Sequence, residues 1–175
     1  MALITLVVGA CGSAAITASP RPARAASFDE YAVAFCSAFD SMFRAIGNPD
    51  TAADSELSAA LDRAIEAGDI ASVERLAGAI TAELESGRQH VAVAGGWQPA
   101  APVMAQADRV FLAFVAMIAA KRAGALHLPG AVEPQAAFEG AGGVDAWFAM
   151  LEASRAMERP AGAAGRQCPT VPIGP

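Results

Sequence analysis

The chain has 175 residues, of which 54% are hydrophobic, and it carries a formal net charge of −6. This length suits one domain with a packed core. All acidic residues fall between Asp29 and Glu158, so the central part of the chain is acidic. This argues against binding to nucleic acid, which depends on Lys and Arg neutralising phosphates.

The N-terminal segment carries a possible targeting signal. An apolar run leads into Val8-Gly9-Ala10-Cys11, where an aliphatic residue and two small residues precede a cysteine. This pattern resembles the lipobox of bacterial secreted lipoproteins. The resemblance implies that residues 1–11 are a signal peptide, that Cys11 is lipidated, and that a lipid anchor holds an extracytoplasmic protein on the cell membrane. No Lys or Arg precedes the apolar run, so we expect the natural leader to start further upstream.

The same region permits a second interpretation with a longer leader. The apolar stretch 3–18 would be the core of a secretory signal peptide, and Ala23-Arg24-Ala25 would be its A-x-A cleavage site. Cleavage after Ala25 would discard Cys11 and release a soluble, secreted protein. In the lipoprotein interpretation, residues 12–26 are instead a flexible linker rich in Ala, Ser and Pro.

Residues 27–159 are expected to form one helical domain. Ser27 and Glu30 match the S-x-x-E capping box that starts a helix, and Gly47 ends it before Asn48-Pro49. Between these signals, large apolar residues recur at steps of three and four, which predicts one broad buried face. Its members are Phe28, Tyr31, Phe35, Phe39, Met42, Phe43 and Ile46.

The next two helices are predicted from similar signals. A second helix covers 52–67 and ends at Gly68. A third is capped by Asp69, buries a stripe that begins at Ile70, and continues weakly past Gly87 to residue 93.

The second half of the chain adds a central helix and a terminal one. The fourth helix, 101–123, is the most apolar and should lie in the interior, with Phe111, Phe114 and Ile118 on its buried face. One helical turn is expected around 134–138. A last helix, 144–158, is predicted to turn Trp147, Phe148 and Leu151 inward, and 160–175 is an irregular tail.

No segment alternates apolar and polar residues as a half-buried strand would. The chain is therefore predicted to be all-α, an antiparallel bundle of about four to five helices.

Cys36 and Cys168 are the only cysteines that follow Cys11. In an oxidising compartment an even pair favours a disulfide, which would join the first helix to the C-terminal tail. A catalytic thiol is poorly supported, because the apolar surroundings of Cys36 disfavour the reactive thiolate.

No residue set indicates a catalytic, cofactor or metal site. His90 and His127 lack the Glu-x-x-His and H-E-x-x-H spacings of helical metal sites. Asp62 and Glu66 share a helix face, but a solvated acidic surface explains them better than an acid–base pair. Trp97 lies in a turn and is expected to plug the end of the bundle.

These observations favour a non-catalytic binding or interaction module with an unknown protein or small-molecule partner. The alternative is a cell-envelope hydrolase or transferase without a recognisable motif.

Overall fold

The computed structural model describes residues 24–25, 27–48, 54–158 and 160. Within these ranges it contains six α-helices, one 3-10 helix and no β-strand, which confirms the all-α prediction. The elements in chain order are α1 (Phe28–Ile46), α2 (Glu56–Glu66), α3 (Ile70–Ala94), η1 (Gln98–Ala100), α4 (Ala101–Ala125), α5 (Pro134–Gly140) and α6 (Gly143–Ala156).

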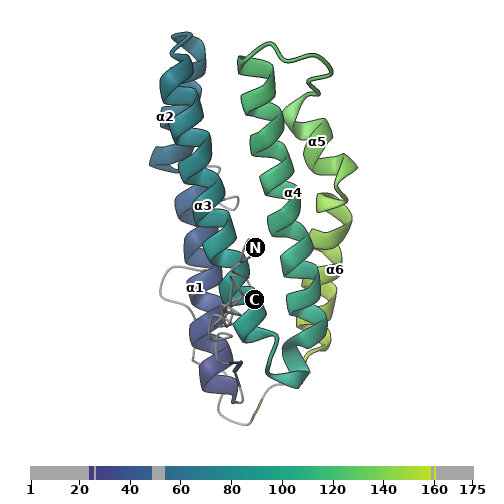
Figure 1. Cartoon of the computed structure of the whole chain (residues 1–175). Coiled ribbons are helices and arrows are strands. Elements are labelled where there is room, and N and C mark those ends of the chain that lie inside the picture. Colours follow the sequence, from purple (N-terminus) through teal and green to yellow (C-terminus); the bar gives the residue numbers. More distant parts are fainter. Residues whose placement is uncertain (1–23, 26, 49–53, 159, 161–175) are drawn as a thin grey trace, which may run out of the picture.

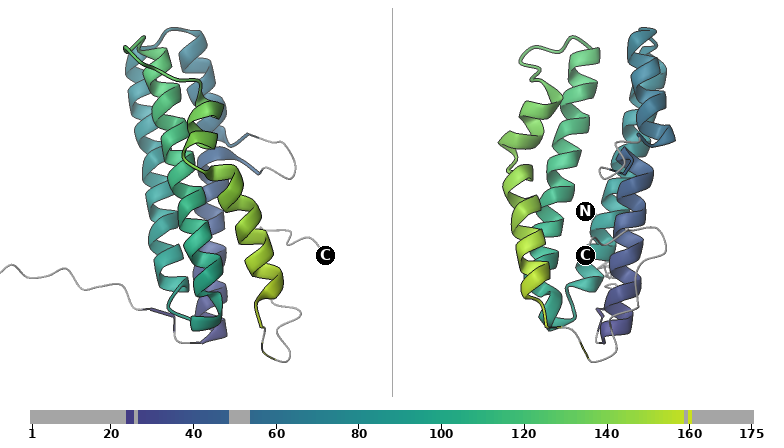
Figure 2. Two further views of the ribbon diagram at one scale, coloured as in Figure 1. Left: turned by 90° about the vertical axis from the view of Figure 1, so that its right-hand side faces the viewer. Right: turned by 180° about the vertical axis from the view of Figure 1, so that it is seen from behind.

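The helices run up and down in four columns (Figure 1). α1 and α2 follow one another along the first column, α3 and α4 are single long helices, and α5 and α6 share the last column. The first three helices form one half of the molecule and the last three form the other half (Figure 2). α3 and α4 pack against each other and join the halves. The fold is therefore an antiparallel bundle in which two of the four columns are broken.

The helix starts follow from their capping residues. The Ser27 hydroxyl accepts a hydrogen bond from the Glu30 backbone N–H at 3.3 Å, and the Ser27 N–H donates to the Glu30 carboxylate at 3.2 Å. The predicted capping box is thus confirmed. Ser55 and Asp69 likewise accept backbone N–H bonds at the starts of α2 and α3. The sequence predicted that the third helix continues only weakly past Gly87. In the structure, α3 continues without a break through Gly87 to Ala94.

The core draws on all four columns. Most residues predicted to face inward on the first four helices are buried or pack against buried residues. Ile70 is an exception, since it is 45% exposed in the first turn of α3. The largest fully buried side chains are Phe111, Met42, Leu61, Ile80, Leu84, Val73, Val103 and Val110.

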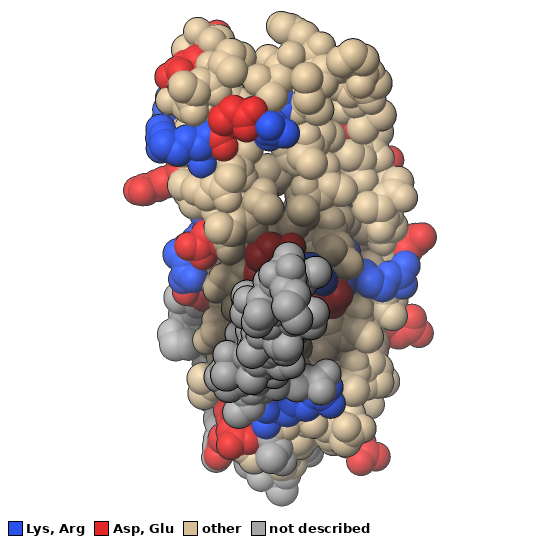
Figure 3. Space-filling view, in the orientation of Figure 1, with Lys and Arg blue, Asp and Glu red and all other residues tan. Residues whose placement is uncertain are grey.

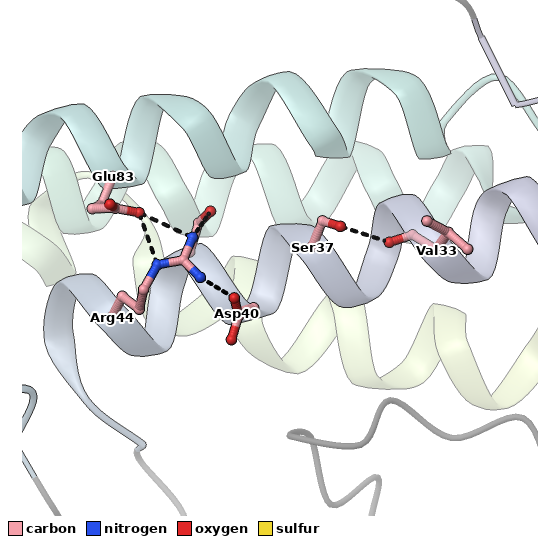
Figure 4. Close-up of polar contacts among 6 residues, drawn as sticks. Val33, Ser37, Asp40, Arg44 and Glu83 are labelled. Atoms are coloured by element: carbon pink, nitrogen blue, oxygen red, sulfur yellow. Dashed lines mark hydrogen bonds and ion pairs between the residues drawn. The ribbon is translucent and has the colours of Figure 1, made fainter.

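Ion pairs connect neighbouring helices around this core. Arg44 of α1 lies between Asp40 of its own helix and Glu83 of α3, with 3.2 Å to the Glu83 carboxylate (Figure 4). Two further cations on α4 pair across the bundle, as described below. On the face seen in Figure 3, Lys and Arg side chains lie next to Asp and Glu side chains instead of forming a separate basic patch. Such partly exposed pairs help to set helix register more than they add stability.

Candidate functional site

An apolar pocket lies where α5 and α6 meet α4. Its volume is about 240 Å³, and six of its seven lining side chains are apolar. The lining residues are Phe114 and Met117 of α4, Gln135 and Phe138 of α5, and Val144, Trp147 and Phe148 of α6. Ligand sites in proteins are typically concave and mostly apolar with few polar groups, and this pocket has that character.

The break between α5 and α6 creates the pocket. Gly142 has φ +76°, a left-handed conformation that favours glycine, and it separates the two helices. Gly143 then lets α6 approach closely, because a Cβ there would stand 2.5 Å from the Phe138 ring and 2.7 Å from the Ala113 Cβ. The Phe138 ring in turn packs against Phe114, with centroids 4.8 Å apart. The pocket walls are thus held by direct contact of three helices.

A stripe of exposed apolar side chains adjoins the pocket. Val144, Phe148 and Leu151 recur at steps of four and three along α6, and Phe148 is 65% exposed. We call these three residues the α6 stripe. Val144 and Phe148 belong to both the stripe and the pocket wall, so the apolar surface is continuous from the inside of the pocket to its rim.

The α6 stripe corrects one sequence prediction. Phe148 and Leu151 were expected to face inward, but α6 instead buries Gly143, Ala146 and Met150. Small residues at positions 143 and 146 let the helix axes come close together, so α6 packs the face with Gly143, Ala146 and Met150 against α4 and leaves Phe148 and Leu151 outside. Trp147 is partly buried and packs against the core, as predicted. Periodicity could not resolve this, because large apolar side chains lie on both the inner and the outer face of α6: Trp147, Phe148, Met150 and Leu151.

Phe114 is a second correction. It was predicted to be buried on the central helix with Phe111 and Ile118, and those two residues are buried. Phe114 is only partly buried and forms part of the pocket wall. Sequence analysis missed the pocket because it depends on the angle between α5 and α6, which no periodic pattern encodes.

The one amide in the pocket lining, Gln135, is paired with a carboxylate. Gln135 donates a hydrogen bond from its amide nitrogen to the Glu139 carboxylate at 2.9 Å. The lining set holds no Ser, Cys, His or carboxylate side chain. The pocket can therefore hold an apolar group but offers no nucleophile or acid–base pair to act on it.

Two cations near the end of α4 pair with helices of the other half of the bundle. Arg122 donates two hydrogen bonds to Glu74 of α3, at 2.5 and 2.6 Å, and Lys121 pairs with Asp62 of α2 at 2.5 Å. The hydrogen bond from Arg122 lowers the pKa of Glu74 below its usual value, and Glu74 raises that of Arg122. Asp62 is thus part of an ion pair and does not form an acid–base pair with Glu66.

A second ion-pair group lies between α3 and α4. Arg88 donates to Asp108 at 2.8 Å and to Glu85 at 3.1 Å. Hydrogen bonding to Asp108 is the main cause that raises the pKa of Arg88. Every charge in this group has a partner, which is typical of a structural network and gives no indication of a reactive site.

Neither of the two histidines lines the pocket. His90 is partly buried within α3, and His127 is exposed just after α4 with φ +50°. In the part of the chain that the structure describes, no three His, Cys, Asp or Glu side chains are grouped so that they could hold a metal ion.

Trp97 closes one end of the bundle, as predicted. Its ring packs edge-on against Phe28 at 5.4 Å and lies 5.1 Å from the Tyr31 ring. These contacts explain its position in a turn without a ligand.

The segment Arg24–Ala25 is packed against the same end of the molecule. The Ala25 N–H donates to the Val93 carbonyl at 3.0 Å, and Ala25 is only 3% exposed. A Cβ on Gly96 would stand 2.5 Å from the Arg24 Cβ, so glycine is needed for this close approach. The segment that sequence analysis assigned to the end of a flexible linker therefore contributes to the core.

The predicted modification sites lie largely outside the described residues. Cys11 and Cys168 both fall there, together with most of the predicted leader and linker. Cys36 is partly buried on α1 and packs against the core. The lipidation of Cys11 and the disulfide between Cys36 and Cys168 stay predictions.

No protein-family model matches this chain, and neither a curated protein nor a solved structure shows significant similarity to it. Among the described residues, one helical stretch, Gln98–Ala125, is long and apolar enough to cross a membrane by length and composition alone. It includes α4, which packs against α3, α5 and α6, and the core helices of soluble proteins can pass the same test.

Proposed function

We propose that this protein is an extracytoplasmic, lipid-anchored helical module that binds an apolar partner or small molecule without catalysis. The observation that carries the proposal is the apolar pocket between α4, α5 and α6, together with the α6 stripe at its rim. A contiguous exposed apolar surface beside a pocket is characteristic of a binding site.

Binding is favoured over the alternative, a cell-envelope hydrolase or transferase. Nucleophilic or acid–base catalysis needs a nucleophile or a titratable group close to the bound substrate. The pocket lining offers only one polar side chain, Gln135, whose amide neither ionises nor acts as a nucleophile at neutral pH. The chemistry of the walls therefore suits the retention of a ligand.

The packing of Ala25 supports lipidation at Cys11 over cleavage after Ala25. Cleavage after Ala25 would remove a residue that is buried and hydrogen-bonded to Val93. Processing at Cys11 would retain this residue and leave residues 12–23 to connect the anchor to the bundle. The lipoprotein interpretation is thus the one that keeps the folded part intact.

The anchor is tested by the intact mass of the protein purified from native membranes. We expect a mature chain that begins at Cys11 and carries acyl chains. Cys11→Ser should leave the chain uncleaved or release it to the medium. A mature N-terminus at Ala26 would overturn the anchor and favour the soluble, secreted form.

Binding is tested by native mass spectrometry and solvent extraction of the same membrane-derived protein. We expect a bound apolar compound that is lost when Val144→Trp fills the pocket. The matched control is Leu112→Trp, because Leu112 is also an exposed apolar residue, 43% exposed on α4, but does not line the pocket. Equal retention in both variants would show that the pocket is not the binding site.

A further inference from the structure

The walls of the pocket and the charges around it specify a class of ligand. We propose that the pocket binds an uncharged aromatic small molecule and that it selects against anions. This inference rests on the proposed function and adds the chemistry of the ligand.

The size and lining of the pocket suit an aromatic ring. Apolar cavities of about 150 Å³ lined by Leu, Ile and Phe bind benzene, and the volume here is about 240 Å³. Four aromatic side chains line it, so a bound ring could pack edge-to-face or offset against its neighbours. They are Phe114, Phe138, Trp147 and Phe148.

The polar groups in the pocket lining are few and uncharged. The Gln135 amide nitrogen gives one of its two N–H groups to Glu139, which leaves its oxygen as an acceptor and its second N–H as a donor; Trp147, also in the lining, carries an indole N–H donor. These neutral groups can hydrogen-bond a hydroxyl or amine on a ligand, but the lining holds no cation that would neutralise a carboxylate or phosphate. The Glu139 carboxylate, held beside Gln135, adds repulsion of an anion.

The charged side chains on and next to α5 and α6 also disfavour the binding of an anion. Four carboxylates lie on or next to these helices, and the segment from residue 133 to residue 156 contains a single cation, Arg155. The carboxylates are Glu133, Glu139, Asp145 and Glu152, all of them exposed. Asp145 directly follows the lining residue Val144, and Glu152 lies one turn beyond Phe148.

Cations near the pocket only partly offset the negative charge of these carboxylates. Lys121 lies one turn beyond Met117 but is paired with Asp62. Arg109 approaches the turn between α5 and α6, where its Nη2 atom would lie 3.5 Å from a Cβ on Gly142. Four carboxylates set against Arg109 and Arg155 leave the surroundings of the pocket with about two net negative charges. At roughly 8 Å in water, two charges would weaken binding of an anion about fivefold relative to a neutral analogue.

Two fluorescent probes that share a ring system test the inference. N-phenyl-1-naphthylamine is neutral and has one N–H, whereas 1-anilinonaphthalene-8-sulfonate adds an anionic sulfonate. Both are titrated into the full chain carrying Cys11→Ser, so that no attached acyl chain or detergent competes for them. We expect the neutral probe to bind at least about fivefold more tightly at low salt, with the ratio reduced at 1 M salt by screening.

Variants show whether the preference belongs to the pocket. Val144→Trp should abolish binding of the neutral probe, and Leu112→Trp should leave it intact. Replacing Glu139 with Gln and Asp145 with Asn should tighten binding of the anionic probe and leave that of the neutral probe nearly unchanged. Circular dichroism of each variant checks that the bundle is folded.

The possible failures are distinguishable. If both probes bind equally and Val144→Trp abolishes both, the pocket is a binding site but the selection against anions is wrong. If neither probe binds, or if Val144→Trp changes nothing, the proposed function fails with the inference. If light scattering shows a dimer that Phe148→Ser dissociates, the α6 stripe is occupied by a second copy of the chain and the small-molecule proposal is overturned.

Discussion

Gly87 of α3 and Phe111 of α4 are in such close contact that a Cβ on Gly87 would stand 2.3 Å from the Phe111 Cε1 atom. The same Cβ would lie 3.2 Å from the backbone oxygen of Ala38 in α1. Three helices therefore meet at this glycine, and Phe111 is only 1% exposed. The absence of a side chain at residue 87 allows α4 to approach the other half of the bundle.

Gly87→Ala should destabilise the protein by about 1–3 kcal/mol, because the buried Phe111 ring must move to make room. The matched control is Gly78→Ala in the same helix, where a Cβ would meet nothing within 4 Å. There alanine should add about 0.5–1 kcal/mol through its better helix propensity. Chemical denaturation of both variants measures the two changes, and the same sign for both would contradict this account of the packing.

His127 adopts a left-handed backbone conformation at the end of α4. Its φ is +50°, and the Leu128 N–H donates to the Ala123 carbonyl to close the helix. Glycine is the usual residue at such a position, since other residues cost roughly 1–2 kcal/mol there. His127→Gly should therefore raise the free energy of unfolding by about 1 kcal/mol, measured by thermal or chemical unfolding. His127→Ala keeps the strain and should give no such gain; a gain equal to that of glycine would show that the backbone is not the cause.

The fold was largely predictable from local signals. The capping box at Ser27, the caps at Asp69 and Gly47, and the three- and four-residue spacing on the first helix all act within a few residues of chain. They give the same helix bounds in the structure, to within a few residues. The exposure of Ile70 was missed because three- and four-residue spacing does not show where along a stripe the buried face ends.

The candidate site was not predictable in the same way. Phe148 and Leu151 match an inward stripe as well as an outward one, because α6 carries large apolar side chains on more than one face. Gly143 and Ala146 determine which face of α6 is buried, because their small size allows close packing on α4. The pocket then depends on the left-handed Gly142, which sets the angle between two helices, and this is a tertiary effect.

The pair of Glu74 and Arg122 should make stability depend on pH. Because Arg122 lowers the pKa of Glu74 in the folded protein, the pair stabilises the fold above the usual Glu pKa of 4.5. The contribution is lost as pH falls through the lowered value and Glu74 becomes protonated. Unfolding of the native chain and of Glu74→Gln should therefore differ at pH 7 and converge at strongly acid pH. Arg122→Gln should remove the same pH-dependent difference; a difference that persists in acid would have another cause.

The last prediction concerns Cys36 and Cys168. A disulfide between them would close a loop of about 130 residues, and chain-entropy arguments assign such a loop about 4–5 kcal/mol. In the Cys11→Ser chain, Cys36→Ala and Cys168→Ala should each lower the free energy of unfolding by a similar amount. The double variant should be scarcely less stable than either single one, because either substitution already removes the bond. Thiol titration of the unfolded, unreduced parent chain should find no free thiol. If Cys168→Ala is neutral while Cys36→Ala is destabilising, Cys36 acts only as a packed apolar side chain on α1, and the tail is not tied to the bundle.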